Sequence, residues 1–173
     1  MLGLPTGQVS LIPWTEQWTI EFMEEERRIR REIRESIVAI HHIGSTAVRG
    51  LSAKPIIDIA IEIPSFDEGN HCVPGLEKLG YSYKGTDVLP DRHYFNKGEP
   101  RTHQIHMYES GSEYLYKQVT LRDYLNANEE ARIEYQLLKE RLVKEYSTNK
   151  FAYSEAKTNF IKTIIRKAER TNK

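Results

Sequence analysis

Two short apolar runs separated by a glycine-serine turn constrain the fold of this chain more than any other feature. Residues 37–43 and 56–63 are rich in β-branched side chains and are bounded by turn-forming residues, which is typical of strands. Gly44 and Ser45 interrupt the pattern between them, and Asp58 lies inside the otherwise apolar second run. A carboxylate among buried neighbours needs a compensating partner, so this region predicts a site.

The rest of the chain predicts a single mixed α+β domain over residues 1–173. Apolar residues at helical spacing predict an amphipathic helix over 16–36, and a less regular helix follows at 65–79. The further strands and helices are predicted at 81–84, 92–96, 102–109, 113–125, 129–145 and 154–171. We therefore expect a mixed central sheet of about five strands, with the N-terminal helix and a helical part from about 112 to 173 packed on one face.

Charge and cysteine content limit the classes of partner. Lys and Arg total 25, as do Asp and Glu, so no overall field attracts nucleic acid or an anionic membrane, and phosphate recognition would need a local cluster. No apolar run approaches the roughly 20 residues that span a bilayer. The single cysteine, Cys72, forms no intramolecular disulfide, and no signal peptide pattern opens the chain, so we expect a cytoplasmic protein without a membrane partner. The oligomeric state cannot be read from the sequence.

The Gly44-Ser45 turn has two interpretations. If a short helix begins at Ser45, its N–H groups and dipole favour an anion, and the hydroxyls of Ser45 and Thr46 add donors for phosphate oxygens. Alternatively, Gly44 only turns the chain and Ser45 caps the helix.

Asp58 also has two interpretations. Strand side chains alternate, so Asp58, Ala60 and Glu62 share one face. Mg²⁺ prefers carboxylate and phosphate oxygens together, so Asp58, with Glu62 as a second carboxylate, predicts a metal site beside a phosphate-binding turn. The alternative is an ion pair of Asp58 with a nearby cation, for which the candidates are Lys54, Arg49 and Arg92.

One histidine and two cations complete the candidate site. His106 lies on a predicted strand, where it would ligate a metal beside Asp58 or act as an acid or base near neutral pH. A strand histidine satisfied by a carbonyl or carboxylate is the alternative. Lys54 and Arg92 are candidate phosphate ligands, because lysine supplies a point charge and arginine binds phosphate with two donors.

The segments "HIGSTAVRGLSAKPIIDI", "VSLIPWTEQW", "HQIHMY", "LRDYL" and "AYSEAKTNFI" resemble the GrpB family over nearly the whole chain. This resemblance implies the nucleotidyltransferase-like fold of the DNA polymerase beta superfamily. It also implies that Gly44 and Ser45 hold the phosphates of a nucleoside triphosphate while Asp58 ligates Mg²⁺.

The sequence departs from the superfamily pattern at two of the three positions that usually carry metal-binding carboxylates. Ala60 occupies the second, and His106 lies where the third is expected. Two-metal phosphoryl transfer needs more ligands than Asp58 provides. We therefore consider two functions: a transferase moving a nucleotidyl or phosphoryl group from a Mg²⁺-bound nucleotide, with Asp58 and His106 catalytic, or a nucleotide- or phosphate-binding module without turnover.

Overall fold

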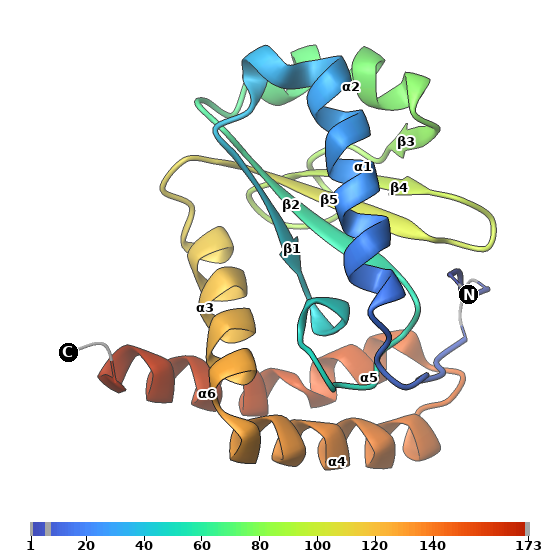
Figure 1. The fold of residues 1–173 in the computed structure, drawn as a ribbon, viewed down its shortest axis with the longest axis vertical. Coiled ribbons are helices and arrows are strands. Elements are labelled where there is room, and N and C mark those ends of the chain that lie inside the picture. The colour runs from blue at the N-terminus through green and yellow to red at the C-terminus, as the bar shows by residue number, and fades with distance from the viewer. Residues whose placement is uncertain (1, 6–7, 172–173) are drawn as a thin grey trace.

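The computed structural model describes residues 2–5 and 8–171, which form a five-stranded sheet with helices around it (Figure 1). The strands run in the order β1-β2-β5-β4-β3, and β2 pairs with β5 in parallel while the other neighbours are antiparallel. Their bounds are β1 Ala39–Ile43, β2 Ile57–Ile63, β3 Tyr81–Tyr83, β4 His93–Lys97 and β5 His103–Glu109. The predicted mixed α+β fold is confirmed.

The helices also follow the predicted segments, with one addition. A seven-residue helix, α5, occupies a stretch that the sequence analysis assigned mostly to a loop. The helices are α1 Gln17–Ile33, α2 Glu68–Lys78, α3 Glu113–Ala127, α4 Glu129–Glu145, α5 Lys150–Ala156 and α6 Thr158–Thr171, with short 3-10 turns η1 Arg34–Ser36 and η2 Ser45–Ala47.

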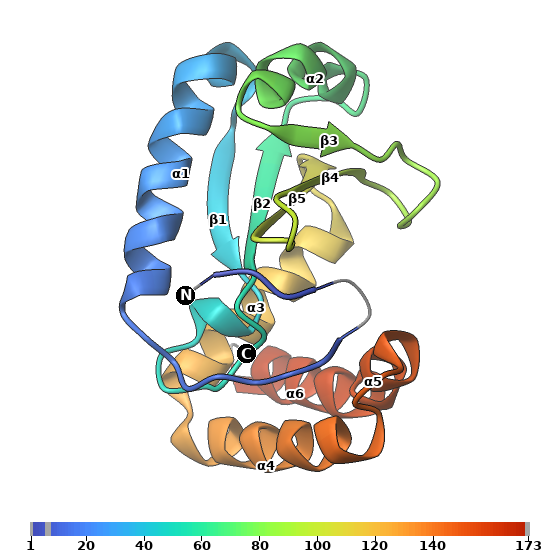
Figure 2. The same ribbon diagram turned by 90° about the vertical axis from the view of Figure 1, so that its right-hand side faces the viewer.

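Alternation along β2 decides which helices cover which face of the sheet. Ile57, Ile59, Ile61 and Ile63 are all fully buried and pack with residues of α1 and α2. Ala60 points to the opposite face, where it packs with residues of β1, β5 and α3. The helices are thus divided between both faces, whereas the sequence analysis expected them on one (Figure 2).

The last three helices lie beyond the end of the sheet rather than on a face of it (Figures 1 and 2). Val48 and Leu51, in the loop that follows β1, are buried against residues of α3, α4 and α6. Val9, from the N-terminal segment, packs against Leu142 and Tyr153 of α4 and α5. The loop between β1 and β2 is therefore held between the sheet and the C-terminal helices.

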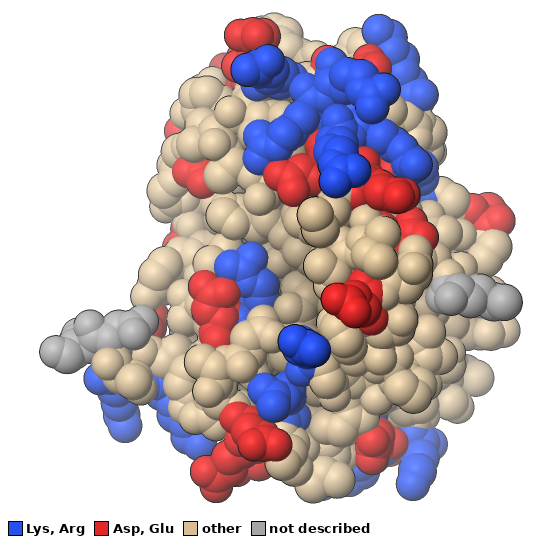
Figure 3. All heavy atoms as spheres, in the orientation of Figure 1, with Lys and Arg blue, Asp and Glu red and all other residues tan. Residues whose placement is uncertain are grey.

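The charged face of α1 behaves as the sequence predicts for a solvated helix. Ion pairs one turn apart join Arg28 to Glu24 at 3.8 Å and Arg30 to Glu26 at 2.8 Å. Figure 3 shows basic and acidic side chains side by side where this helix meets α2. Exposed pairs of this kind contribute little to stability.

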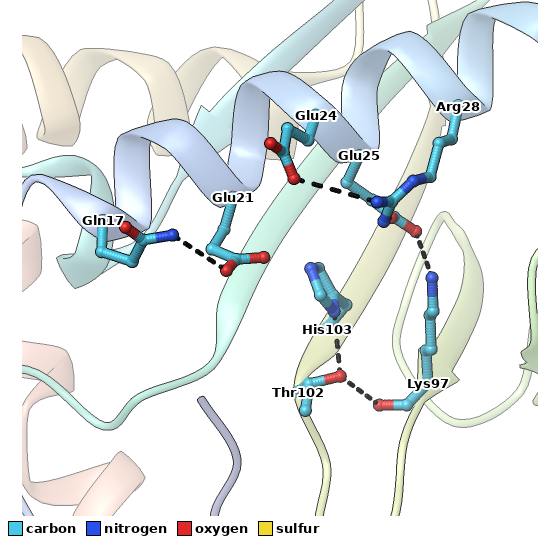
Figure 4. A network of polar contacts seen from close by, with 8 residues as sticks. All are labelled: Gln17, Glu21, Glu24, Glu25, Arg28, Lys97, Thr102 and His103. Carbon is cyan, nitrogen blue, oxygen red and sulfur yellow. Dashed lines mark hydrogen bonds and ion pairs between the residues drawn. The ribbon is translucent and has the colours of Figure 1, made fainter. Parts of the chain in front are cut away.

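Glu25 of α1 instead points inward and forms an ion pair that links the helix to the sheet. Glu25 is fully buried and accepts hydrogen bonds from Lys97 of β4 at 2.7 Å and from Arg28 at 3.0 Å (Figure 4). Burial acts to raise the pKa of Glu25, but the hydrogen bond and charge of Lys97 outweigh it and hold this pKa below its ordinary value. Within the described residues, no helix is both long and apolar enough to cross a membrane.

Candidate functional site

The turn after β1 and the carboxylate of β2 lie in direct contact. Ile43, the last residue of β1, is paired with Asp58, which brings Gly44 beside it. A Cβ built on Gly44 would lie 2.8 Å from Asp58 Oδ2, and Gly44 has a φ of +73°. Glycine is needed at this position both for its backbone angle and for the close approach of the carboxylate.

Asp58 is held by two residues of the neighbouring strand β5. Gln104 Nε2 donates to its Oδ1 at 2.7 Å, and His106 Nε2 lies 3.6 Å from the same oxygen. Burial acts to raise the pKa of Asp58, but the contacts with His106, the charge of Lys54 and the bond from Gln104 lower it overall. The side chain keeps 27% of its surface exposed, so a charged carboxylate faces an open space.

Arg92 contacts His106 on the side away from Asp58, and it does not reach the open space that the Asp58 carboxylate faces. Its Nη1 lies 3.4 Å from His106 Nδ1, and because arginine only donates, Nδ1 accepts and the ring turns an Nε2–H toward Asp58. Arg92 Nε donates to the Pro90 carbonyl at 3.0 Å, and the guanidinium lies over the ring of Tyr108. The structure therefore places Arg92, a predicted phosphate ligand, in a packed position away from Ser45 and Lys54.

Gln104 was missed by the sequence analysis although it orients Asp58. Its Oε1 accepts from the hydroxyl of Tyr94 at 2.5 Å and from Arg101 at 3.2 Å, which leaves its amide to donate to the carboxylate. Strand alternation could have identified Gln104 as a site residue, because it lies on the same face of β5 as His106.

The two hydroxyls of the turn have different surroundings. Thr46 is 2% exposed, and its Oγ1 contacts His42 Nε2 at 2.9 Å and the Ile56 carbonyl at 3.5 Å, so it braces the loop. Ser45 and Thr46 both line the cavity between this turn and the C-terminal helices. The 3-10 turn η2 has three residues, so the helix dipole that the sequence analysis considered at Ser45 does not develop.

A cavity of about 250 Å³ opens between the turn and the C-terminal helices. Gly44, Ser45, Lys54 and Asp58 lie on its sheet side. The helical side carries Arg122, Tyr135, Lys139, Lys150, Tyr153 and Lys157. Three of these six residues are lysines, all from the chain beyond residue 138, more than 80 positions after Asp58.

Four lysines give the cavity its electrostatic character. Burial lowers the pKa of Lys139 to about 6 and that of Lys157 to about 8, and in both cases the charge of Lys54 lowers it further. Burial also lowers the pKa values of Lys54 and Lys150. These shifts arise because ammonium groups are crowded together away from water.

The lysines are positioned by aromatic rings and one carbonyl. The ammonium groups of Lys157 and Lys54 lie 4.4 Å and 5.2 Å from the centre of the Tyr153 ring, and Lys139 donates to the carbonyl of Ser52. Among the described residues, none of the four lysines has a carboxylate within 4.0 Å. The lysine side chains are therefore held in place without a carboxylate partner in the described part of the chain, and Lys139, with a pKa of about 6, carries its charge mainly below that pH.

The residues present do not fit a two-metal centre. Ala60 is fully buried in an apolar cluster, and Glu62 is not among the cavity-lining residues. In the part of the chain that the structure describes, no group of three or more His, Cys, Asp or Glu side chains is arranged to hold a metal ion. Asp58 and His106 lie together as the sequence analysis expected, but no second carboxylate joins them.

Comparisons with known proteins agree with the fold. The family model described as GrpB protein matches residues 8–167. UPF0157 protein YqkA of Bacillus subtilis is 36% identical over 170 residues, covering 98% of this chain and 50% of that protein, so the chain spans half the length of this relative.

Solved structures extend the likeness. The crystal structure of conserved protein GrpB from Enterococcus faecalis superimposes with a TM-score of 0.87 at 29% identity, covering 94% of this chain and 99% of that one. The Cid1 poly(U) polymerase, bound to Mg and 3'-dATP, aligns with a TM-score of 0.58 at 12% identity, covering 84% of this chain and 49% of that one. At this identity the second likeness shows a shared nucleotidyltransferase-like fold.

Proposed function

The chain belongs to the GrpB family, and from this premise we propose that its cavity binds a phosphorylated small molecule such as a nucleoside triphosphate, as a binding module without turnover. The observation that carries the proposal is the group of four lysines around one cavity, facing a single carboxylate. A buried excess of positive charge is costly unless an anion compensates it. A phosphorylated ligand supplies that anion.

The turn and the lysines have separate tasks in this proposal. Ser45 lies on the sheet side of the cavity, and in this proposal its hydroxyl donates to a phosphate oxygen, while Gly44 allows the turn to lie close to the Asp58 carboxylate. The lysines of the helical side then neutralise the phosphate charge. The cavity volume of about 250 Å³ suits part of a nucleotide rather than a macromolecule.

Nucleotidyl transfer is the second candidate, favoured by one observation. Asp58 and His106 lie beside the Gly44-Ser45 turn at the cavity, in a chain whose fold resembles that of Cid1 poly(U) polymerase. The missing carboxylate counts against it, because in-line phosphoryl transfer needs the metal ions and the attacking oxygen fixed together.

A thermal-shift screen tests binding directly. Nucleosides and their mono-, di- and triphosphates are each added with EDTA, Mg²⁺ or Mn²⁺, and the midpoint of thermal unfolding is recorded. A ligand that binds only the native state raises this midpoint, and we expect the rise to grow with the number of phosphates. If no phosphorylated compound raises it beyond sulfate at equal ionic strength, the proposed function is wrong.

Two further measurements separate the candidates. Release of pyrophosphate from a nucleoside triphosphate with Mg²⁺ would establish transfer, whereas binding without release is expected here. Ser45→Ala should weaken binding by about 1.5–3 kcal/mol, the scale of a hydrogen bond to a charged group. An unchanged dissociation constant would show that the phosphates do not contact the Ser45 hydroxyl.

A further inference from the structure

The charges around the cavity are strongly unequal among the described residues. Four lysines line it, and Asp58 is its one Asp or Glu side chain. Arg122 also lines it, although its guanidinium is already paired with Asp123 at 2.8 Å and with the His42 carbonyl at 3.0 Å. The net charge of the lining is therefore positive whenever the lysines are protonated.

The residues that line the cavity favour the binding of a divalent cation only weakly. Burial lowers the pKa values of Lys54, Lys150 and Lys157, and the charge of Asp58 acts against this lowering in all three, so one carboxylate is already shared among three lysines. A divalent cation would have to compete with these ammonium groups for Asp58 and would be repelled by them. Hard cations are held by several oxygen ligands, and the cavity supplies few.

The lysines are nevertheless arranged as a receptor for several adjacent anionic oxygens. They come from four separate places, namely the loop before β2, helix α4, the start of α5 and the junction of α5 with α6. The ammonium groups of Lys54 and Lys157 both lie over the Tyr153 ring, and Lys139 donates to the Ser52 carbonyl. Ammonium groups held in this way contact a ligand without a large loss of side-chain entropy on binding.

Resting on the proposed function, we infer that Lys54, Lys139, Lys150 and Lys157 take the place of metal ions, so that the cavity binds a chain of two or three phosphates without a divalent cation. The ligand class is a nucleoside di- or triphosphate, or another compound with linked phosphates. A single phosphate engages only part of the lysine set and binds more weakly. Mg²⁺ competes with the lysines for the same oxygens and weakens binding.

The experiment is calorimetric titration with inorganic triphosphate and inorganic phosphate, each in EDTA and in excess Mg²⁺. We expect inorganic triphosphate to bind in EDTA at least tenfold more tightly than inorganic phosphate, and less tightly when Mg²⁺ is added. Lys157→Gln and Lys150→Gln should each weaken the binding of triphosphate about tenfold, as expected for a lost hydrogen bond to a charged group.

Matched controls come from the same part of the chain. Lys162 of α6 and Lys144 of α4 are exposed and do not line the cavity, so Lys162→Gln and Lys144→Gln remove the same charge elsewhere. Both should leave the dissociation constant within about twofold of the original. Circular dichroism of each variant checks folding, and Lys150→Gln carries the test if Lys157→Gln does not fold.

The outcomes distinguish this inference from the proposed function. Binding of nucleotides and triphosphate only when Mg²⁺ is present overturns the inference and leaves the proposed function standing. Binding in EDTA that Lys157→Gln and Lys150→Gln do not weaken overturns the inference as well. Absence of binding by every phosphorylated compound under both conditions overturns both.

Discussion

Gly44 has a restricted environment in the turn after β1. Its φ of +73° favours glycine, and a Cβ there would meet a carboxylate oxygen of Asp58 at 2.8 Å. A position of the Gly44-Ser45 turn beside Asp58 was expected from the sequence, because the two were interpreted as a phosphate-binding turn and a metal ligand. Its closeness was not, because it depends on the register that pairs Ile43 with Asp58.

Gly44→Ala should destabilise the fold by about 3 kcal/mol, since a strained backbone angle and a clash with Asp58 add together. Gly85→Ala is the matched control, because Gly85 has a φ of +85° and no atom within 4 Å of an added Cβ. It should cost about 1 kcal/mol, the penalty for the backbone angle alone. Urea denaturation compares the two, and equal losses would mean that the carboxylate moves aside freely.

The lowered pKa of Lys139 predicts how the free energy of unfolding changes with pH. It is 1% exposed, and burial, Lys157 and Lys54 lower its pKa from 10.5 to about 6, while Glu140 acts in the opposite direction and Tyr135 lies beneath its ammonium group. The unfolded chain therefore binds more protons than the folded chain between about pH 6 and 10.5. The resulting destabilisation is complete below this window and fades as the pH rises through it.

Lys139→Met removes the titrating group while keeping a side chain of similar length. The variant should be more stable than the original protein, and this gain in the free energy of unfolding should be largest near pH 6 and should decline toward pH 10. Urea denaturation at pH 6, 8 and 10 measures this, with Lys144→Met as an exposed control on the same helix. A difference that stays constant across the three pH values would show that Lys139 does not titrate in this window.

At the level of elements, the predicted segments correspond closely to the observed strands and helices. The strand at 57–63 and the helix at 129–145 have clear periodicity and clear boundaries, and the structure has them within a residue of the prediction. Helix α5 was missed because its seven residues, around Phe151 and Tyr153, show no amphipathic repeat. Tertiary contacts with Val9 and Leu142 stabilise it instead.

The candidate site was predictable only on its sheet side. Gly44, Ser45, Lys54 and Asp58 lie within 15 consecutive residues, so local pattern suffices to group them. Lys139 lies on a helix rich in other charges, where the pattern alone indicates solvent exposure, and Lys150 lies between two predicted helices. They reach the cavity because α4–α6 fold back over the loop after β1, a long-range arrangement that periodicity does not encode.

The ion pair that links α1 to the sheet predicts how much Glu25 contributes to stability. Glu25→Ala should destabilise the protein by about 3 kcal/mol, because it leaves the partly buried Lys97 without its carboxylate. Glu24→Ala, one residue earlier and 49% exposed, should change stability by less than about 0.5 kcal/mol. Urea denaturation of both variants is the measurement, and similar effects would mean that the inward contact with Lys97 adds no stability.

Across the whole molecule, the balance of 25 basic and 25 acidic residues conceals an uneven distribution. The outer face of α1 mixes both signs (Figure 3), whereas the cavity concentrates four lysines about one carboxylate. The sheet positions the turn and Asp58, and the C-terminal helices bring the lysines opposite to them. Recognition of phosphate thus depends on how the two parts of the fold meet.

The affinity of Asp58→Asn for inorganic triphosphate in EDTA tests this account most directly. Asparagine keeps the shape of the side chain and an oxygen for the Gln104 bond, while it removes the one negative charge among the described side chains of the cavity. If the lysines alone hold the phosphates, calorimetry should show binding roughly fivefold tighter than in the original protein, a gain of about 1 kcal/mol. Loss of binding in the folded variant would contradict the account and show that the carboxylate itself is needed to hold the ligand.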